Sequence, residues 1–237
     1  MSTFASVAQT IPYPWPLSGS WGPENTAIVV IDMQRDFLAE EGYFASLGED
    51  VSHLRQAIEP AQDFLRAARQ HPFLIIHTRE SHRPELLDLQ DNKRRKGLRQ
   101  DSPVGKAGPL GRLLVRGEKG CDFYPGFTPQ PGEIVVDKPG NSAFYATDFE
   151  HILRTRQVRH LILLGVTTDV CVSSTMREAN DRGFDCLLLN DCCGAANEQL
   201  HQNTLSSLSH EGGIFGAYSE SDAIIQTLRQ AINGPES

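Results

Sequence analysis

The sequence lacks the features of a membrane-spanning or secreted protein. No stretch approaches the run of about 18 apolar residues that a membrane-spanning helix needs, and the N-terminus has no basic segment that leads into an apolar one. Five cysteines are an odd number for a disulfide framework, and no C-x-x-C pair is present. We therefore expect a cytoplasmic protein with free thiols and no membrane partner.

An excess of positive charge is also missing. The chain carries a formal net charge of -8, whereas a nucleic-acid partner would need a basic face to neutralise its phosphates. The one basic cluster, 93-KRRK-96, has acidic neighbours, and such a short run is typical of a solvated loop or helix face. The composition therefore predicts no nucleic-acid partner.

Signatures of several enzyme classes are absent as well. The sequence contains no G-x-S-x-G of a serine hydrolase, no G-x-G-x-x-G of a dinucleotide enzyme and no phosphate-binding P-loop. A non-catalytic binding module stays open at this point, because a fold does not determine a function.

The chain has enough apolar residues for one core. Its 237 residues are 39% hydrophobic, which suffices for one sizeable core. We expect a single domain over 25–237, preceded by a proline-rich arm over 1–24. The segment 11-IPYPWPLSGSWGP-23 excludes a regular helix or an interior strand, so the arm should lie over the body or over a neighbouring subunit.

Strands and helices alternate after the arm. Apolar, strand-like runs occupy 27–31, 73–78, 134–137, 161–165, 185–190 and the region near 214–217. Helical patterns cover 53–70, 147–156, 170–182, 197–209 and 221–232, the second opening with the capping-box pattern 147-TDFE-150. A polar loop region fills 80 to about 130. Strands without polar alternation are covered on both faces, so we predict a three-layer α/β/α fold, Rossmann-type, with a mostly parallel central sheet.

Three chemically distinct side chains follow strands of this sheet. In parallel sheets, ligands bind outside the carboxyl ends of the strands. Asp32, Lys138 and Cys171 all fall at that edge, and a carboxylate, an ammonium and a thiol together suit nucleophilic catalysis. Each is ambiguous alone, since Asp32 could cap a loop, Lys138 could be a surface lysine and Cys171 could pack as a small apolar side chain. Their shared position favours a catalytic set.

Cys171 also falls near the predicted start of a helix, close to Asp169. Exposed N–H groups and the helix dipole favour an anion there and lower a thiol pKa. We therefore expect a thiolate nucleophile whose own N–H helps to hold an oxyanion. Cys186, Cys192 and Cys193, which bracket a strand-like run, are expected to be structural.

Three long stretches resemble the cysteine hydrolase branch of the isochorismatase-like family: 28-IVVIDMQRDF-37, 136-VDKPGNSAF-144 and 165-GVTTDVCVSSTMREANDRG-183. Members that keep the cysteine hydrolyse C–N bonds, whereas isochorismatases proper lack it. The resemblance therefore implies an amidohydrolase.

The resemblance also assigns roles within the site. It implies that Asp32 is the general acid/base, Lys138 the cationic partner and Cys171 the nucleophile. It further implies a non-proline cis peptide between Val166 and Thr167, which would aim the Thr167 N–H, together with that of Cys171, at the oxyanion.

The histidines after the second strand bear on metal binding. Nicotinamidases of this family bind a metal there through Asp-x-His and a further histidine. In this chain the region reads 77-HTRESHRP-84, where His77 and His82 are present without an Asp-x-His. We expect no metal and no other cofactor.

Within the family, 12-PYPWP-16, 77-HTRESHRPELLDL-89 and 91-DNKR-94 resemble hydrolases of biuret and triuret. The resemblance implies cleavage of the terminal carboxamide C–N bond of a small linear ureide through a cysteine thioester, with release of ammonia and a carboxylate product. Hydrolases of ureidoacrylate, N-carbamoylsarcosine and nicotinamide are the alternatives. A homo-oligomer, either a dimer or a tetramer, is also expected.

Phe37, Asn141 and Glu211 are the expected substrate-binding residues, and in the biuret pattern the positions of Asn141 and Glu211 contact polar groups of the substrate. Asn141 stands where that pattern has a lysine, and Glu211 where it has a glutamine. A carboxylate only accepts hydrogen bonds, so Glu211 favours a neutral substrate with N–H donors over an anionic one. The shorter Asn141 leaves room for triuret.

Overall fold

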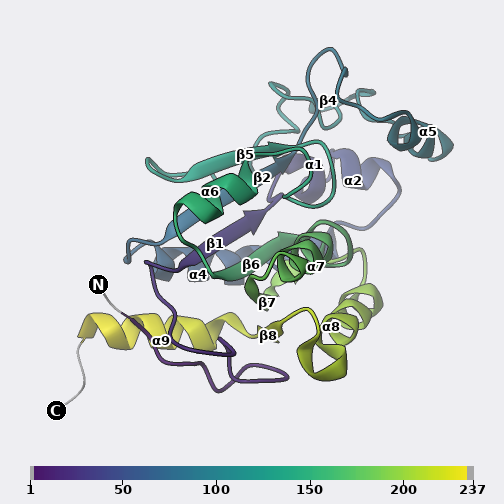
Figure 1. The fold of residues 1–237 in the computed structure, drawn as a ribbon. Coiled ribbons are helices and arrows are strands. Elements are labelled where there is room, and N and C mark those ends of the chain that lie inside the picture. Colours follow the sequence, from purple (N-terminus) through teal and green to yellow (C-terminus); the bar gives the residue numbers. More distant parts are fainter. Residues whose placement is uncertain (1–2, 234–237) are drawn as a thin grey trace.

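The computed structural model describes residues 3–233 and contains one six-stranded sheet in the order β5-β2-β1-β6-β7-β8 (Figure 1). The strands are β1 (Thr26–Ile31), β2 (Leu74–Glu80), β5 (Ile134–Lys138), β6 (His160–Val166), β7 (Asp185–Gly194) and β8 (Ala217–Ser219). All five strand pairings of this sheet are parallel. The predicted α/β architecture is therefore confirmed.

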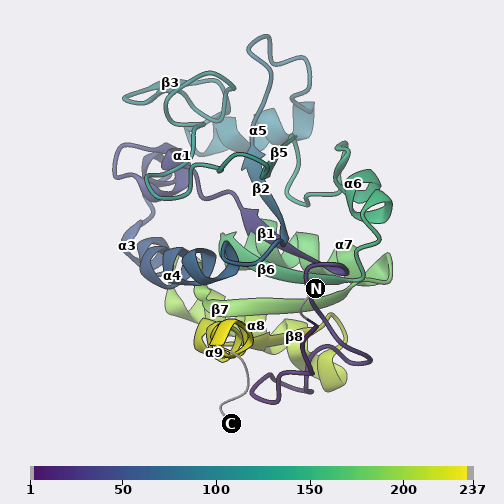
Figure 2. The same ribbon diagram turned by 90° about the vertical axis from the view of Figure 1, so that its left-hand side faces the viewer.

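Helices cover both faces of the sheet (Figure 2). One face is covered by α4 (Ile58–Ala68) and α9 (Ser221–Asn233), the other by α6 (Phe149–Thr155), α7 (Ser173–Asp181) and α8 (Glu198–Gly213). Side chains of the central strand alternate between the two layers: Ile28 and Val30 face α4, whereas Val29 and Ile31 face α6 and α7. Each large apolar side chain buried in this way contributes about 1.5–3 kcal/mol.

Several predicted boundaries were wrong. The single helix expected over 53–70 is interrupted, and α3 (Ser52–Arg55) ends before α4 begins. Pro60 explains the break, because its ring is tolerated in the first turn of α4 but would clash with the carbonyl of Gln56 in a continuous helix.

Two other predicted features also differ. The strand predicted near 214–217 lies a few residues further along the sequence, as β8. The capping box is not formed, although the Thr147 hydroxyl accepts a hydrogen bond from the Phe149 N–H at 3.2 Å.

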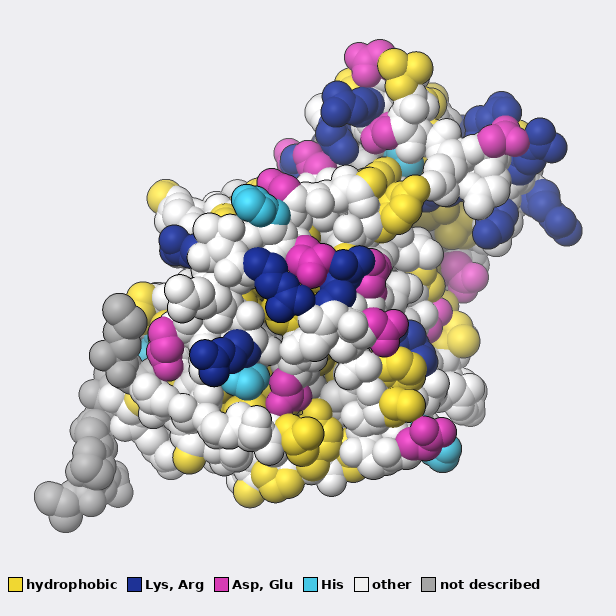
Figure 3. Space-filling model, in the orientation of Figure 1, with side chains coloured by type: hydrophobic (Ala, Val, Ile, Leu, Met, Phe, Trp, Pro, Cys, Tyr) yellow, Lys and Arg dark blue, Asp and Glu magenta, His cyan; other side chains and the backbone are white. Residues whose placement is uncertain are grey.

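The region 80–130 is more ordered than predicted. It contains α5 (Asp91–Arg99) and a small antiparallel pair, β3 (Ala107–Gly108) and β4 (Gly111–Arg112). Lys and Arg side chains gather over α5 at the upper right of Figure 3. This helix has almost no apolar face, and only Gly97 is buried in it, so hydrophobic periodicity could not reveal it.

The proline-rich arm packs on the body of its own chain. Trp15 and Trp21 are fully buried, and Ile11 forms a bridge to Tyr218 in β8. The arm thus covers apolar surface at the α9 side of the sheet. No helix among residues 3–233 has both the length and the apolar character needed to cross a membrane.

Candidate active site

Adjacent strands bring Asp32 and Lys138 together. Asp32 follows β1 with φ 50°, a left-handed conformation that aspartate adopts more readily than most residues. Its Oδ1 accepts a hydrogen bond from the Thr78 hydroxyl at 2.6 Å, and its Oδ2 lies 2.7 Å from Lys138 Nζ at the end of β5. Both charged side chains are fully buried. The structure therefore joins two of the three predicted catalytic residues in a buried ion pair.

The chain reaches Cys171 through a tight passage beside β1. Gly165 has φ 124°, and a Cβ there would lie 2.0 Å from the Ile31 carbonyl oxygen, so only glycine fits. The Val166–Thr167 peptide is cis, as the resemblance implies. A π-helical turn, Thr168–Val172, then places Cys171 Sγ 3.5 Å from Lys138 Nζ. The predicted α-helix over 170–182 is thus a π-helical turn followed by α7.

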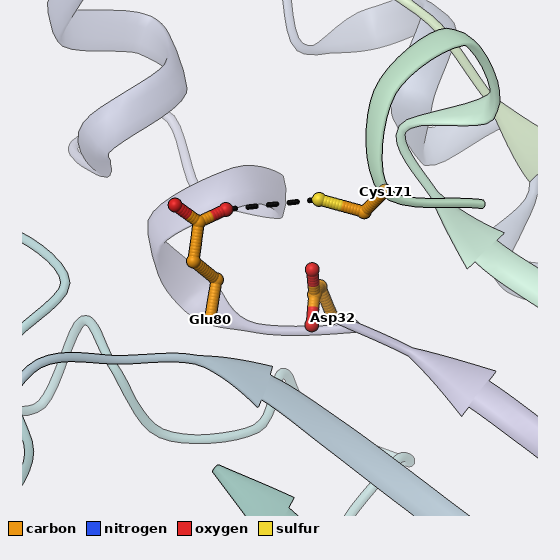
Figure 4. A group of neighbouring side chains, drawn as sticks. All are labelled: Asp32, Glu80 and Cys171. Carbon is orange, nitrogen blue, oxygen red and sulfur yellow. Dashed lines mark hydrogen bonds between the residues drawn. The ribbon is translucent and has the colours of Figure 1, made fainter. Parts of the chain in front are cut away.

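Glu80 is a fourth member of this group that the sequence analysis missed. It is the last residue of β2, and its Oε2 lies 3.6 Å from Cys171 Sγ (Figure 4). Only 6% of Glu80 is exposed. The rule that selects strand ends would have found it, but the predicted strand ended at Thr78. Because β2 continues to Glu80, its carboxylate reaches the thiol.

Lys93 supplies a second cation to the group. Its Nζ lies 2.6 Å from Glu80 Oε1, 2.9 Å from His82 Nε2 and 2.9 Å from the Pro139 carbonyl oxygen. The prediction that 93-KRRK-96 forms a solvated face is therefore wrong for Lys93. Arg94 and Arg95 do lie on the exposed side, paired with Asp91.

The charges of the group determine its protonation. Burial alone would lower the pKa of Lys138, but Asp32, Cys171 and Glu80 raise it above its ordinary value. Burial likewise opposes ionisation of Glu80, yet Lys93 and Lys138 hold the pKa of this carboxyl below its usual range. The group thus contains two ammonium ions beside its carboxylates.

Cys171 differs from the predicted thiolate. Burial raises the pKa of its thiol well above the ordinary value, and Asp32 and Glu80 raise it further, while Lys138 lowers it. Only 3% of Cys171 is exposed, and removal from water disfavours the charged form of a thiol. The expectation of a lowered pKa was therefore wrong, and the resting thiol is protonated near neutral pH.

Alkylation should report this protonation state. Iodoacetamide should modify Cys171 slowly near pH 7, with a rate that rises about tenfold per pH unit up to pH 9, because only the thiolate reacts. The measurement is mass spectrometry of the Cys171 peptide in the folded protein. Fast modification that is already independent of pH at 7 would show a lowered pKa instead.

The predicted oxyanion donors lie at the same turn. Thr167 is buried and precedes the π-helical turn, and its carbonyl accepts hydrogen bonds from the Val170 and Val172 N–H groups. The roles of the Thr167 and Cys171 N–H groups in holding an oxyanion stay a prediction.

The three predicted substrate-binding residues lie in different surroundings. Phe37 is buried in α1 (Arg35–Leu38), with its ring edge-on to Tyr43 in α2 (Tyr43–Ser46). Asn141 is exposed and lines a cleft together with Lys93, Gly140 and Tyr145, directly outside the Glu80–Lys93 pair.

Glu211 lies apart from these residues. It is exposed at the end of α8 with φ 51°, two residues before Gly213, which lies against Tyr13 of the arm. The other part of α8 is nearer the thiol, since His201 Nδ1 lies 2.9 Å from the Thr168 hydroxyl. Within residues 3–233, no contact joins Glu211 to the catalytic group.

The group also has the atoms of a cation site. Ligand atoms of Asp32, Glu80 and Cys171 all lie within 4.8 Å of one another. However, Lys138 Nζ already contacts Asp32, and Lys93 Nζ contacts Glu80. A divalent ion would have to displace these ammonium groups, so the residues present do not fit a resident metal.

The two histidines do not complete such a site. His82 Nε2 faces Lys93, and fully buried His77 directs its Nε2 to Glu133 at 2.7 Å. The two rings are thus engaged in separate contacts.

Activity is accordingly expected to survive exhaustive treatment with EDTA, because internal ammonium groups supply the positive charge. Turnover is measured before and after chelation, with metal content checked in the same sample. A loss of turnover that zinc or iron alone restores would contradict this reading.

Comparison with known proteins places the chain in a family. The isochorismatase domain model matches residues 26–218. The ureidoacrylate amidohydrolase RutB of Klebsiella pneumoniae is 30% identical over 224 residues, which cover 91% of this chain and 92% of that protein. The RutB of Klebsiella variicola is equally similar.

Solved structures share the fold. A cysteine hydrolase from Pseudomonas syringae superposes with a TM-score of 0.76 at 24% identity and covers 92% of this chain and 96% of its own. N-carbamoylsarcosine amidase from Thermoplasma acidophilum gives a TM-score of 0.63 at 20% identity, covering 84% and 97%. By the family model and the two Klebsiella relatives, the chain belongs to the isochorismatase-like family.

Proposed function

We propose that the protein is a cysteine-dependent amidohydrolase in which Cys171 attacks the carbon of a terminal carboxamide. The observation that carries this proposal is the placement of Lys138 Nζ, 2.7 Å from Asp32 Oδ2 and 3.5 Å from Cys171 Sγ. One ammonium thus links a proton acceptor to a nucleophile in a buried site. Such a triad is the arrangement that covalent catalysis needs.

The reaction begins with proton transfer, because the resting thiol is neutral. Asp32 takes the Cys171 proton as the sulfur attacks, and Lys138 stabilises the negative charge on the sulfur. The carbonyl oxygen becomes an oxyanion held by the N–H groups of Thr167 and Cys171, where one such donor is typically worth about 2.7–4 kcal/mol.

Collapse of this intermediate breaks the C–N bond. Asp32 returns its proton to the leaving nitrogen, which departs as ammonia and leaves a thioester on Cys171. Water, deprotonated by Asp32, then attacks the thioester carbon, and the thiol and a carboxylate product are released. These residues complete the cycle without a cofactor.

The substrate proposed first is a neutral linear ureide, triuret or biuret. The polar groups around the thiol form two charge-balanced pairs, Asp32 with Lys138 and Glu80 with Lys93. A neutral ligand with N–H donors preserves this balance. An anionic ligand brings a negative charge for which these two pairs leave no free cation. This argument favours biuret and triuret over anionic amides.

Ureidoacrylate is the second candidate. The observation in its favour is the 30% identity to the Klebsiella ureidoacrylate amidohydrolases over most of both chains. The carboxylate of ureidoacrylate would have to reach the cleft outside the Asp32–Lys138 and Glu80–Lys93 pairs. Lys96 is one of the residues that line this cleft.

Ammonia release from a substrate panel tests the proposal. We expect kcat/KM for triuret and biuret to exceed those for ureidoacrylate and N-carbamoylsarcosine by at least about tenfold, since an unpaired buried acceptor costs about 1–3 kcal/mol. Nicotinamide, which lacks a ureide, should react more slowly. A preference for ureidoacrylate would select the second candidate, and no ammonia from any of these compounds would contradict the amidohydrolase proposal.

The same panel with Glu211→Gln tests the role that the resemblance assigns to this residue. A changed ratio of triuret to biuret hydrolysis would support contact with the substrate. An unchanged ratio would show that Glu211 does not contact the substrate, in agreement with its exposed position in the structure.

A further inference from the structure

Glu80 divides its carboxylate between two partners. Its Oε1 lies 2.6 Å from Lys93 Nζ, and its Oε2 lies 3.6 Å from Cys171 Sγ. A thiol is a weak hydrogen-bond donor, and Cys171 is the only hydrogen-bond partner of Oε2 in the described part of the chain. This oxygen therefore retains capacity for a stronger donor beside the reacting sulfur.

Lys93 fixes the orientation of that carboxylate. An ammonium has three protons, and Lys93 Nζ has three acceptors: Glu80 Oε1, His82 Nε2 and the Pro139 carbonyl oxygen. His82 can accept only if its proton is on Nδ1, which lies 3.4 Å from Asp88 Oδ1. The saturated ammonium holds Oε1 in place and so aims Oε2 at the thiol.

The backbone of Glu80 is held as firmly. The buried side chain of Gln34 accepts a hydrogen bond from the Glu80 N–H at 2.8 Å and donates one to the Glu80 carbonyl at 3.0 Å. The side chain and the backbone of Glu80 are thus each held by their own partners, which is the preorganisation expected of a group that orients a ligand.

Asp32 serves the proposed reaction in another way. Its Oδ1 accepts a hydrogen bond from Thr78, and its Oδ2 lies 2.7 Å from the Lys138 ammonium, which also contacts the sulfur, so this carboxylate is placed as the proton acceptor. Glu80 is the carboxylate whose Oε2 has the weakly donating thiol as its one hydrogen-bond partner among residues 3–233.

We infer that Glu80 is a specificity-determining residue whose Oε2 accepts an N–H from the nitrogen of the scissile carboxamide, and that Lys93 is the residue that positions it. This inference rests on the proposed amidohydrolase function. Sulfur attack on the carboxamide carbon brings the attached nitrogen within reach of an oxygen 3.6 Å from that sulfur. The contact selects substrates that carry N–H on the attacked carbon and gives no benefit to an ester.

Biuret and methyl allophanate form the matched substrate pair. Methyl allophanate carries a methoxyl where biuret carries the scissile amino group, and both leave the same acyl group on the thiol. Ammonia release from biuret and methanol release from the ester are measured for the wild type and for Glu80→Gln.

In Glu80→Gln the amide oxygen turns toward the Lys93 ammonium, so an NH2 group faces the substrate N–H. We expect kcat/KM for biuret to fall about 10- to 100-fold, as for loss of a hydrogen bond to a charged group, and kcat/KM for the ester to change less than about threefold. Equal losses on both substrates would overturn the inference and leave Glu80 a structural role. A wild type inactive on both would instead refute the proposed function, and the inference with it.

Variants of α5 separate positioning from general damage. Lys93→Met should reproduce the selective loss on biuret, and Lys93→Arg should restore part of it because a cation returns beside Glu80. Arg95→Met is the matched control, since Arg95 is an exposed cation on the same helix whose one ion-pair partner among the described residues is Asp91. The positioning role would be contradicted if Lys93→Met lowered kcat/KM equally for biuret and for the ester. It would also be contradicted if Arg95→Met caused the same selective loss on biuret.

Discussion

Replacement of Cys171 by alanine or serine is expected to lower kcat by about four orders of magnitude or more, as for removal of a catalytic nucleophile. Alanine removes the attacking atom. Serine keeps the shape, but its hydroxyl is far harder to deprotonate, and the site already opposes an anion at this position. Rates of ammonia release from the best substrate, measured at equal protein concentration, check this prediction.

The fold should survive these substitutions, because serine has nearly the size of cysteine and the neighbouring turn is held by other contacts. Circular dichroism and Tm provide the check. Cys186→Ala is a suitable control, since Cys186 is also a buried thiol but lies in β7, where its sulfur contacts the Phe184 carbonyl. Wild-type rates in either Cys171 variant would end the nucleophile assignment, and so would a Cys186 variant that is equally inactive.

Replacement of Lys138 by methionine is expected to abolish turnover and to lower the free energy of unfolding by about 3–5 kcal/mol, the usual cost of removing one partner of a buried ion pair. Without the ammonium, the carboxylates of Asp32 and Glu80 share a buried site with no cation between them. Urea denaturation and activity are measured on the same preparation.

A second substitution separates the two effects. Asp32→Asn added to Lys138→Met should recover much of the lost stability, because the uncompensated carboxylate is gone, and should recover no activity, because the proton acceptor is gone too. If Lys138→Met is as stable as the wild type, the ion pair contributes less than the buried geometry implies.

The strand-end rule explains why the triad could be predicted from the sequence. Parallel strands end at one edge, so Asp32 after β1, Lys138 at the end of β5 and Cys171 beyond β6 had to lie close together. The apolar runs of β1 and β6 are buried along their whole length, which makes their pattern unambiguous, whereas Val135 of the edge strand β5 is 40% exposed. The resemblance added the cis peptide at Val166–Thr167, which no local pattern in the residues indicates.

Glu80 and Lys93 were missed for physical reasons. Arg79 and Glu80 extend β2 beyond its apolar run, and charged residues usually mark the end of a strand rather than its last pair. Lys93 sits in a helix with almost no apolar face, so nothing in 93-KRRK-96 distinguishes the one lysine that turns inward. Only the packing of α5 against the 139–141 loop reveals this orientation.

The protonation of Cys171 was mispredicted because two effects oppose each other. A helix start favours a thiolate, and this part of the argument can be read from the sequence. The burial of the thiol cannot, and it is the largest effect on the pKa of Cys171; Lys138 opposes it, whereas Asp32 and Glu80 add to it.

The central claim is that Cys171 carries the acyl group between the two halves of the reaction. Acid quenching during turnover of biuret or triuret, followed by mass spectrometry of intact protein and of its peptides, tests this claim directly. The account predicts an added mass equal to the acyl group on the peptide that contains Cys171, absent from Cys171→Ala. Sustained turnover with an adduct on another residue, or by the Cys171→Ala protein, would contradict it.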